Sequence, residues 1–190
     1  MVAASSWGRV LGHALSPALA ALLLFAGLAQ AEAPASAAQA QQRAKAVTQV
    51  VLGILSYARW PANPVPLRLC LVGPTEYADD LIKGNVQNSG QPLEVRRLLA
   101  DDARIANACD AVYIGKLNSG ERERLFQAIN GHPVLSISEA DDPCRVGSLF
   151  CLRVGDDQVA FEVNLDSVAR SGVRIHPSVL QLSRRRAVQP

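Results

Sequence analysis

The sequence predicts an α/β protein: a three-layer sandwich whose mostly parallel sheet is extended by a C-terminal antiparallel hairpin and stapled by disulfides. Three observations lead to this fold class. Short apolar runs with strand character alternate with short helical patterns across residues 67–138, as in a parallel sheet covered by helices. Two further strand-like runs flank Gly155-Asp156-Asp157, which suits a tight hairpin turn. Four cysteines follow the N-terminal segment.

The N-terminal residues 1–31 have the features of a cleavable secretory signal peptide. Arg9 and His13 precede an apolar run from Ala18 to Ala29, and Ala29-Gln30-Ala31 supplies an Ala-x-Ala cleavage site. An uncleaved membrane anchor is the alternative, but the run is short and rich in Ala and Gly. We therefore expect export, and a bacterial periplasm is the compartment that fits best.

The exported part is expected to form one domain. Residues 32–45 are rich in Ala and Gln and are interpreted as a flexible lead-in, and residues 46–190 as a single α/β domain. A helix becomes convincing where apolar residues recur at spacings of three and four, at Val47, Val50, Val51, Ile54, Leu55 and Ala58. It ends at Trp60-Pro61, because the residue before proline is pushed out of the α region.

The remaining elements follow in order. Thr75 is expected to cap a helix over residues 76–83, and Asn118 with Glu121 resembles the capping pair of a helix over residues 120–130. A final amphipathic helix carries Val179, Leu180 and Leu182 and ends in Arg184-Arg185-Arg186. The other expected strands and helices are strands over residues 67–73, 93–98, 111–115 and 133–138, and helices over residues 102–108 and 165–170.

In the hairpin, period-two alternation places Phe150, Leu152 and Val154 on one face. If that face leaves an apolar residue exposed near the strand end, Phe150, with Glu162 and Val168 nearby in sequence, would form a partner-binding edge. Packing of Phe150 in the core is the alternative.

An even number of cysteines in an oxidising compartment favours two disulfides, although four cysteines permit three connectivities. Cys144 and Cys151 are close in sequence, and their bridge would constrain the unfolded chain by about 2.5 kcal/mol. Cys70 and Cys109 lie at elements that can be neighbours in a parallel sheet, and their bridge would contribute about 4 kcal/mol. Two structural staples are one interpretation, and a redox-sensitive switch is the other.

Several function classes receive no support from the sequence. The net charge is only +2, and no Lys/Arg patch is interleaved with aromatics, so nucleic acid is not an expected partner. No metal site is expected, because Cys-x-x-Cys is absent and the exported part has only His132 and His176. No Gly-x-Ser-x-Gly elbow or dinucleotide loop is present, so we expect neither an enzyme nor a cofactor.

Two basic–aromatic clusters suggest a ligand site. Arg174 and His176 are two residues apart, so in an extended segment both point the same way and suit a carboxylate. Arg59 would add a second cation and Trp60 an aromatic wall. The alternative is an exposed polar edge with Trp60 packed in the core.

The ordered set of motifs resembles the YfiR family over nearly the whole exported chain. The matching pieces are Arg59-Trp60-Pro61, Leu69 to Gly73, Ala111 to Gly115, Val134 to Ser138, Val159 to Asn164 and Val173 to Ser178. The resemblance implies a periplasmic repressor that holds an inner-membrane diguanylate cyclase, YfiN, inactive. An outer-membrane lipoprotein, YfiB, would sequester the repressor, raising cyclic di-GMP and promoting biofilm.

The resemblance also implies a homodimer stabilised by its disulfides. Arg59, Arg174 and His176 would line a pocket for a small amino-acid-like ligand, and Phe150 and Glu162 would face the cyclase. Two other hypotheses remain open: a periplasmic small-molecule binding module and, least supported, a thiol-redox enzyme that would need a reactive cysteine.

Overall fold

The computed structural model describes residues 32–83, 91–139, 144, 147–156 and 158–182. The expected signal peptide and the Arg184–Arg186 run lie outside these residues. The chain divides into two units, Met1–Ala37 and Ala38–Pro190, and the domain discussed below is the second.

The first helix, α2, spans Glu32–Tyr57, so the segment expected to be a flexible lead-in is helical. The physical reason is composition, because alanine has the highest helix propensity and glutamine is also a good helix former. Contacts with the domain core begin at Ala44, and Val47, Val51 and Ile54 are fully buried. Their spacing confirms the apolar face that the sequence predicts.

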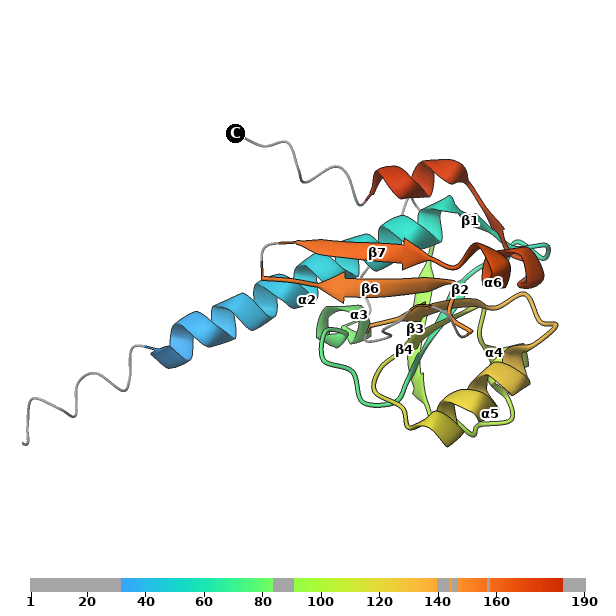
Figure 1. Ribbon diagram of the computed structural model, residues 1–190, viewed down its shortest axis with the longest axis horizontal. Helices are drawn as coiled ribbons and strands as arrows, with labels where there is room; N and C mark the ends of the chain where they lie inside the picture. The colour runs from blue at the N-terminus through green and yellow to red at the C-terminus, as the bar shows by residue number, and fades with distance from the viewer. Residues whose placement is uncertain (1–31, 84–90, 140–143, 145–146, 157, 183–190) are drawn as a thin grey trace, which may run out of the picture. The chain divides into compact units, whose positions relative to one another are not determined.

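The central sheet has six strands in the order β3-β2-β4-β5-β6-β7 (Figure 1). All neighbouring strands are parallel except the β6–β7 pair, in which Phe150 lies opposite Val163. The first hairpin strand is thus parallel to β5 and interior to the sheet, and only β7 is antiparallel. The strands are β2 (Leu67–Val72), β3 (Leu93–Leu98), β4 (Ala111–Ile114), β5 (Leu135–Ser138), β6 (Phe150–Val154) and β7 (Val159–Val163).

Two apolar clusters on opposite faces of the sheet confirm the three-layer arrangement. Alternate residues of β2 separate them, because Leu69 and Leu71 pack with α2 whereas Val72 packs with α5. The second cluster is covered by α4 (Ile105–Ala108) and α5 (Ser119–Ile129). The α5 start has the expected capping box, in which Asn118 Oδ1 accepts from Glu121 N–H and the Glu121 carboxylate accepts from Asn118 N–H.

The shorter elements differ more from expectation. Helix α3 is only Asp79–Ile82, and its N-cap is Ala78, without a side-chain cap. Thr75 does not cap it, because the Thr75 hydroxyl accepts a hydrogen bond from Arg97. The chain ends in α6 (Leu165–Arg170), the two-residue strand β8 (Arg174–Ile175) and the 3₁₀ turn η1 (Pro177–Gln181), which replaces the start of the expected amphipathic helix.

Candidate functional site

The four cysteines form two disulfides, Cys70–Cys109 and Cys144–Cys151, which are the pairs that the sequence favoured. Both cysteines of the first disulfide are buried. Cys70 lies in β2, and Cys109 lies in the segment before β4. In the second bridge Cys151 is buried and Cys144 is half-buried. No cysteine is free.

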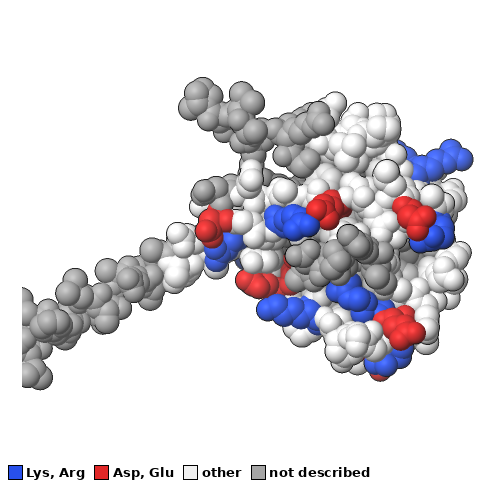
Figure 2. All heavy atoms as spheres, in the orientation of Figure 1, with Lys and Arg blue, Asp and Glu red and all other residues white. Residues whose placement is uncertain are grey.

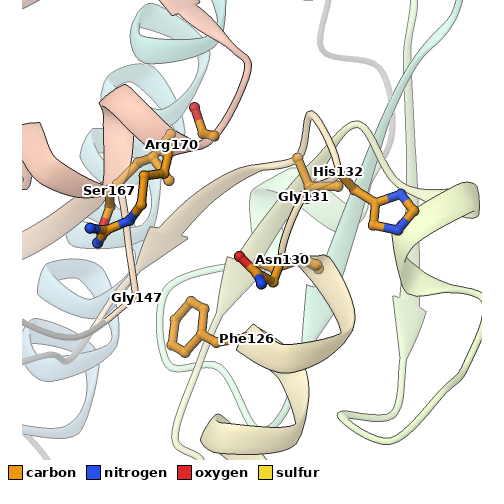
Figure 3. Close-up of a pocket in the computed structure, with 11 residues that line it drawn as sticks. Phe126, Asn130, Gly131, His132, Gly147, Ser167 and Arg170 are labelled. Carbon is orange, nitrogen blue, oxygen red and sulfur yellow. The ribbon is translucent and has the colours of Figure 1, made fainter.

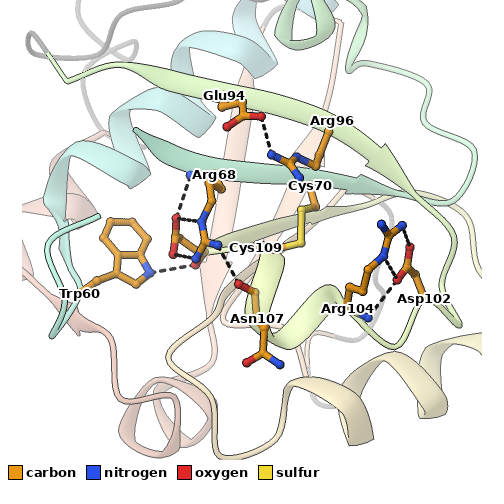
Figure 4. The surroundings of a disulfide bond; sticks show 10 residues. Trp60, Arg68, Cys70, Glu94, Arg96, Asp102, Arg104, Asn107 and Cys109 are labelled. Carbon is orange, nitrogen blue, oxygen red and sulfur yellow. Dashed lines mark hydrogen bonds and ion pairs between the residues drawn. A yellow bond between two sulfur atoms is a disulfide. The ribbon is translucent and has the colours of Figure 1, made fainter. Parts of the chain in front are cut away.

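A buried polar cluster surrounds the first disulfide (Figure 4). The Asp110 carboxylate accepts three hydrogen bonds from Arg68, one from its backbone N–H and two from its guanidinium, at 2.7–2.9 Å. These bonds raise the pKa of the Arg68 guanidinium above its ordinary value. The Trp60 indole N–H donates to the Asp110 carbonyl oxygen at 2.8 Å. The cluster therefore ties β2, the end of α2 and the start of β4 together.

The expected ligand residues Arg59, Arg174 and His176 line one surface pocket of about 510 Å³. Strand β1 (Ala58–Arg59) pairs antiparallel with β8, and this register sets Arg59 directly opposite Arg174. Trp60 is not part of the pocket, because adjacent residues of an extended segment point to opposite sides. Its side chain is 6% exposed and packs in the core, which corrects the expectation of an aromatic wall.

Tyr57 provides the aromatic surface instead. Its ring stacks on the His176 ring, with the centroids 6.2 Å apart. The Tyr57 carbonyl oxygen accepts a hydrogen bond from the backbone N–H of His176 at 2.9 Å. His176 Nδ1 accepts from the Ser178 N–H, so in the neutral ring the proton is on Nε2. The basic–aromatic cluster in the sequence also contains Tyr57, two residues before Arg59, but only the geometry shows that Tyr57 rather than Trp60 lines the pocket.

The expected partner-binding edge is only partly at the surface. Phe150 is fully buried and meets Phe161 edge-to-face at 5.7 Å, so the expectation that it forms an exposed docking edge is wrong for this conformation. The reason is that β6 lies between β5 and β7 and α2 covers this face. Glu162 is exposed and pairs with Arg153, and Val168 is half-buried against the core.

Sequence reasoning missed a buried carboxylate, Glu139, at the carboxyl end of β5. It accepts hydrogen bonds from the backbone N–H groups of Glu76 and Tyr77 and from the Tyr113 hydroxyl. Burial, reinforced by the Glu139 charge, raises the pKa of Tyr113 well above its usual range, so this hydroxyl remains a donor. The carboxylate thereby fastens the loop after β2 to the sheet. An acidic residue directly after an apolar strand was the available signal.

A second, smaller cavity of about 150 Å³ lies between the end of α5 and α6 (Figure 3). Elsewhere, acidic and basic side chains alternate on the face shown in Figure 2, as expected from pairs such as Arg153–Glu162 and Arg43–Asp156. Among the described residues, no cluster of His, Cys, Asp or Glu is arranged to hold a metal ion. In the same part of the chain, no helix has the length and hydropathy needed to cross a membrane.

Together these features define an α/β domain braced by two disulfides, in which the described residues line a surface pocket and a smaller cavity. A family model described as YfiR/HmsC-like matches residues 44–184, well over half of the 190-residue chain. The chain belongs to the YfiR/HmsC-like family, which confirms the resemblance seen in the sequence. This family is regulatory and non-catalytic, and membership suggests a periplasmic regulator in cyclic di-GMP signalling.

Proposed function

We propose that this protein is a periplasmic repressor that binds and inhibits an inner-membrane diguanylate cyclase resembling YfiN. By inhibiting the cyclase, the repressor lowers cyclic di-GMP and biofilm formation. A YfiB-like outer-membrane lipoprotein relieves the inhibition by sequestering the repressor. The observation that carries the proposal is the family match over residues 44–184. The signal-peptide features of residues 1–31 agree with action in the periplasm.

Repression requires that the protein bind the inactive conformation of the cyclase more tightly than the active one, because equal affinity shifts no equilibrium. Glu162 and Val168 remain the proposed partner-binding residues. Leu165 lies between them in sequence and is 75% exposed, which makes this region a candidate apolar contact. Phe150, which is buried, supports the hairpin by packing against Phe161. The repressor is proposed to act as a homodimer.

Deletion of the gene tests the repressor role. Cyclic di-GMP, measured by mass spectrometry in extracts, is expected to rise and to return to its original level on complementation. Unchanged nucleotide in the deletion strain would contradict the proposal.

Complementation with Glu162→Arg tests the surface, since reversing an exposed charge changes recognition more than folding. Glu123→Arg is the matched control, because Glu123 is also exposed but lies on α5, in the opposite layer. Repression is expected to fail with Glu162→Arg and to persist with Glu123→Arg. Full repression by both variants would remove Glu162 from the interface.

A second candidate function is binding of a small amino-acid-like ligand in the Arg59–Arg174 pocket. The observation favouring it is the placement of Arg59 opposite Arg174, because like charges directly opposite each other repel and a bound anion would relieve this repulsion. In the structure the Arg59 guanidinium donates to the Ser56 and Ala58 carbonyl oxygens. A carboxylate suits the two guanidinium groups, and Tyr57 with His176 suits a ring. Calorimetric titration with aromatic amino acids tests this function.

Heat of binding is expected for the native protein and for Arg104→Gln, whose guanidinium is exposed and distant in the fold. It should be lost in Arg59→Met and in Arg174→Met. If no aromatic amino acid gives heat of binding, only the proposed role as a repressor of the cyclase would remain.

A further inference from the structure

The cavity between α5 and α6 is separate from the Arg59–Arg174 pocket and shares no residue with it. Its floor is apolar and consists of Phe126, Ile129, Val134 and Leu149, of which the last three are buried. The cavity measures about 150 Å³, which is large enough for a benzene-sized ring.

Two glycines shape this cavity. An added Cβ at Gly147 would stand 2.4 Å from the Phe126 ring, so the backbone there lies directly against the aromatic wall. A Cβ at Gly131 would meet nothing within 4 Å, so this side is the open mouth. Both residues have positive φ, which glycine adopts without strain. The backbone at Gly147 and the Phe126 ring therefore form one closely packed wall of the cavity.

Polar groups lie on both sides of the cavity, with Asn130 and His132 at the end of α5 and Ser167 and Arg170 on α6 (Figure 3). Ser167 is 8% exposed, and its backbone N–H donates to Asn164 Oδ1 at 3.0 Å. Its hydroxyl has no hydrogen-bond partner among the described residues. Arg170 lies one helical turn further and pairs with Asp166 at 2.7 Å. This exposed pair is weak, and a guanidinium has five donors, so Arg170 can serve Asp166 and a second carboxylate together.

We propose that this cavity is a second small-molecule site that takes a compact aromatic carboxylate of about benzoate size. The ring occupies the space above Phe126, and the carboxylate accepts from the Ser167 hydroxyl and the Arg170 guanidinium. The site shares no residue with the Arg59–Arg174 pocket or with the proposed partner-binding residues. Because the ligand is small, its affinity is expected to lie in the millimolar range.

Titration of ¹⁵N-labelled protein with sodium benzoate tests the site by NMR. Shifts are expected at the amides of Gly131, Gly147 and Ser171, and they can be told apart from shifts at Arg59 and Ile175, which report the other pocket. Ser167→Leu fills the cavity and should abolish the first set alone. Arg170→Gln should weaken benzoate binding roughly three- to tenfold, whereas Arg104→Gln, which also loses an exposed paired guanidinium, should not.

Arg170 is exposed, so its substitution keeps the test valid even where Ser167→Leu does not fold. Saturable shifts at Gly131 and Gly147 that need Arg170 support the site. The proposal would be overturned by shifts confined to the Arg59 pocket or by equal binding of benzyl alcohol. It would also be overturned by the absence of shifts at about 10 mM benzoate, a concentration above the dissociation constant expected for so small a ligand. None of these outcomes bears on repression of the cyclase.

Discussion

Asp110 is the side chain on which most of the structure around the first disulfide depends. It is nearly buried, and its charge is neutralised by Arg68, which is itself about one third exposed. Arg68→Met removes the two guanidinium donors and leaves a buried carboxylate with the residue-68 backbone N–H. We expect the free energy of unfolding to fall by about 2 kcal/mol.

Urea denaturation of the oxidised protein measures this loss. Arg104→Met is the matched control, because Arg104 makes a similar pair with the partly buried Asp102 carboxylate but its guanidinium is exposed. Its unfolding midpoint should change little. Equal midpoint shifts for the two variants would contradict the importance given to the more buried Arg68–Asp110 pair.

The pair of Asp102 with the exposed Arg104 predicts a pH effect. Hydrogen bonds from the Arg104 guanidinium and backbone N–H lower the pKa of Asp102 to about 2. A depressed pKa in the folded state stabilises the protein above the unfolded-state pKa of about 3.9, and this contribution is lost as the pH falls toward 2. NMR titration of the Asp102 carboxyl group should give a pKa of about 2.

In Arg104→Gln the Asp102 midpoint should rise toward its ordinary value but not reach it, because the backbone donor remains. A midpoint that stays near 2 in the variant would show that the guanidinium is not the main cause.

The ligand pocket shows how far single residues can be read from sequence. Arg174 and His176 were found because period-two spacing puts them on one side, and β8 confirms this geometry. The same rule places Arg59 and Trp60 on opposite sides once their segment is extended. That Ala58–Arg59 forms a strand depends on pairing with β8, more than a hundred residues away, and this pairing is not visible locally.

Among helices and strands, those with strong local signals were predicted well. The apolar runs of β2, β4 and β5 and the Asn118–Glu121 capping box need no tertiary information. Phe150 was misplaced because the sequence shows a hairpin but not that β6 would join β5 and become interior. The Ala-rich start of α2 was misjudged because high helix propensity without an apolar stripe resembles an unstructured segment.

The two disulfides connect elements at different separations and should differ in their contributions. Cys70 and Cys109 are 39 residues apart, and Cys144 and Cys151 are 7 apart. Loop-closure entropy predicts that removing the longer bridge costs about 4 kcal/mol and the shorter about 2.5 kcal/mol. Denaturation of the Cys70→Ala/Cys109→Ala and Cys144→Ala/Cys151→Ala proteins compares them directly. A larger loss of stability in the Cys144→Ala/Cys151→Ala protein would contradict this prediction.

The shorter disulfide also braces the proposed partner-binding region. Asn164 links it to α6, because Asn164 Nδ2 donates to the Cys144 carbonyl oxygen while Asn164 Oδ1 caps the helix. We expect Cys144→Ser to weaken repression more than it weakens secretion. Periplasmic protein by immunoblot and cyclic di-GMP by mass spectrometry give the two values. Equal losses would indicate simple misfolding.

For the molecule as a whole, the fold and family could be predicted from sequence because the motifs are ordered along nearly the entire exported chain. The partner surface could not, because recognition depends on which hydrophobic residues the sheet leaves uncovered. Leu165 is exposed and Phe150 is buried, and this difference depends on the position of each residue relative to the sheet and to α2.

The central claim is that this protein inhibits a membrane diguanylate cyclase by direct contact. The most direct measurement is the rate of cyclic di-GMP synthesis from GTP by the purified full-length cyclase in nanodiscs, which expose both faces. Adding the oxidised, signal-peptide-free protein should lower this rate in a saturable manner, and adding the YfiB-like lipoprotein should restore it. A rate that stays constant at saturating repressor would contradict the account.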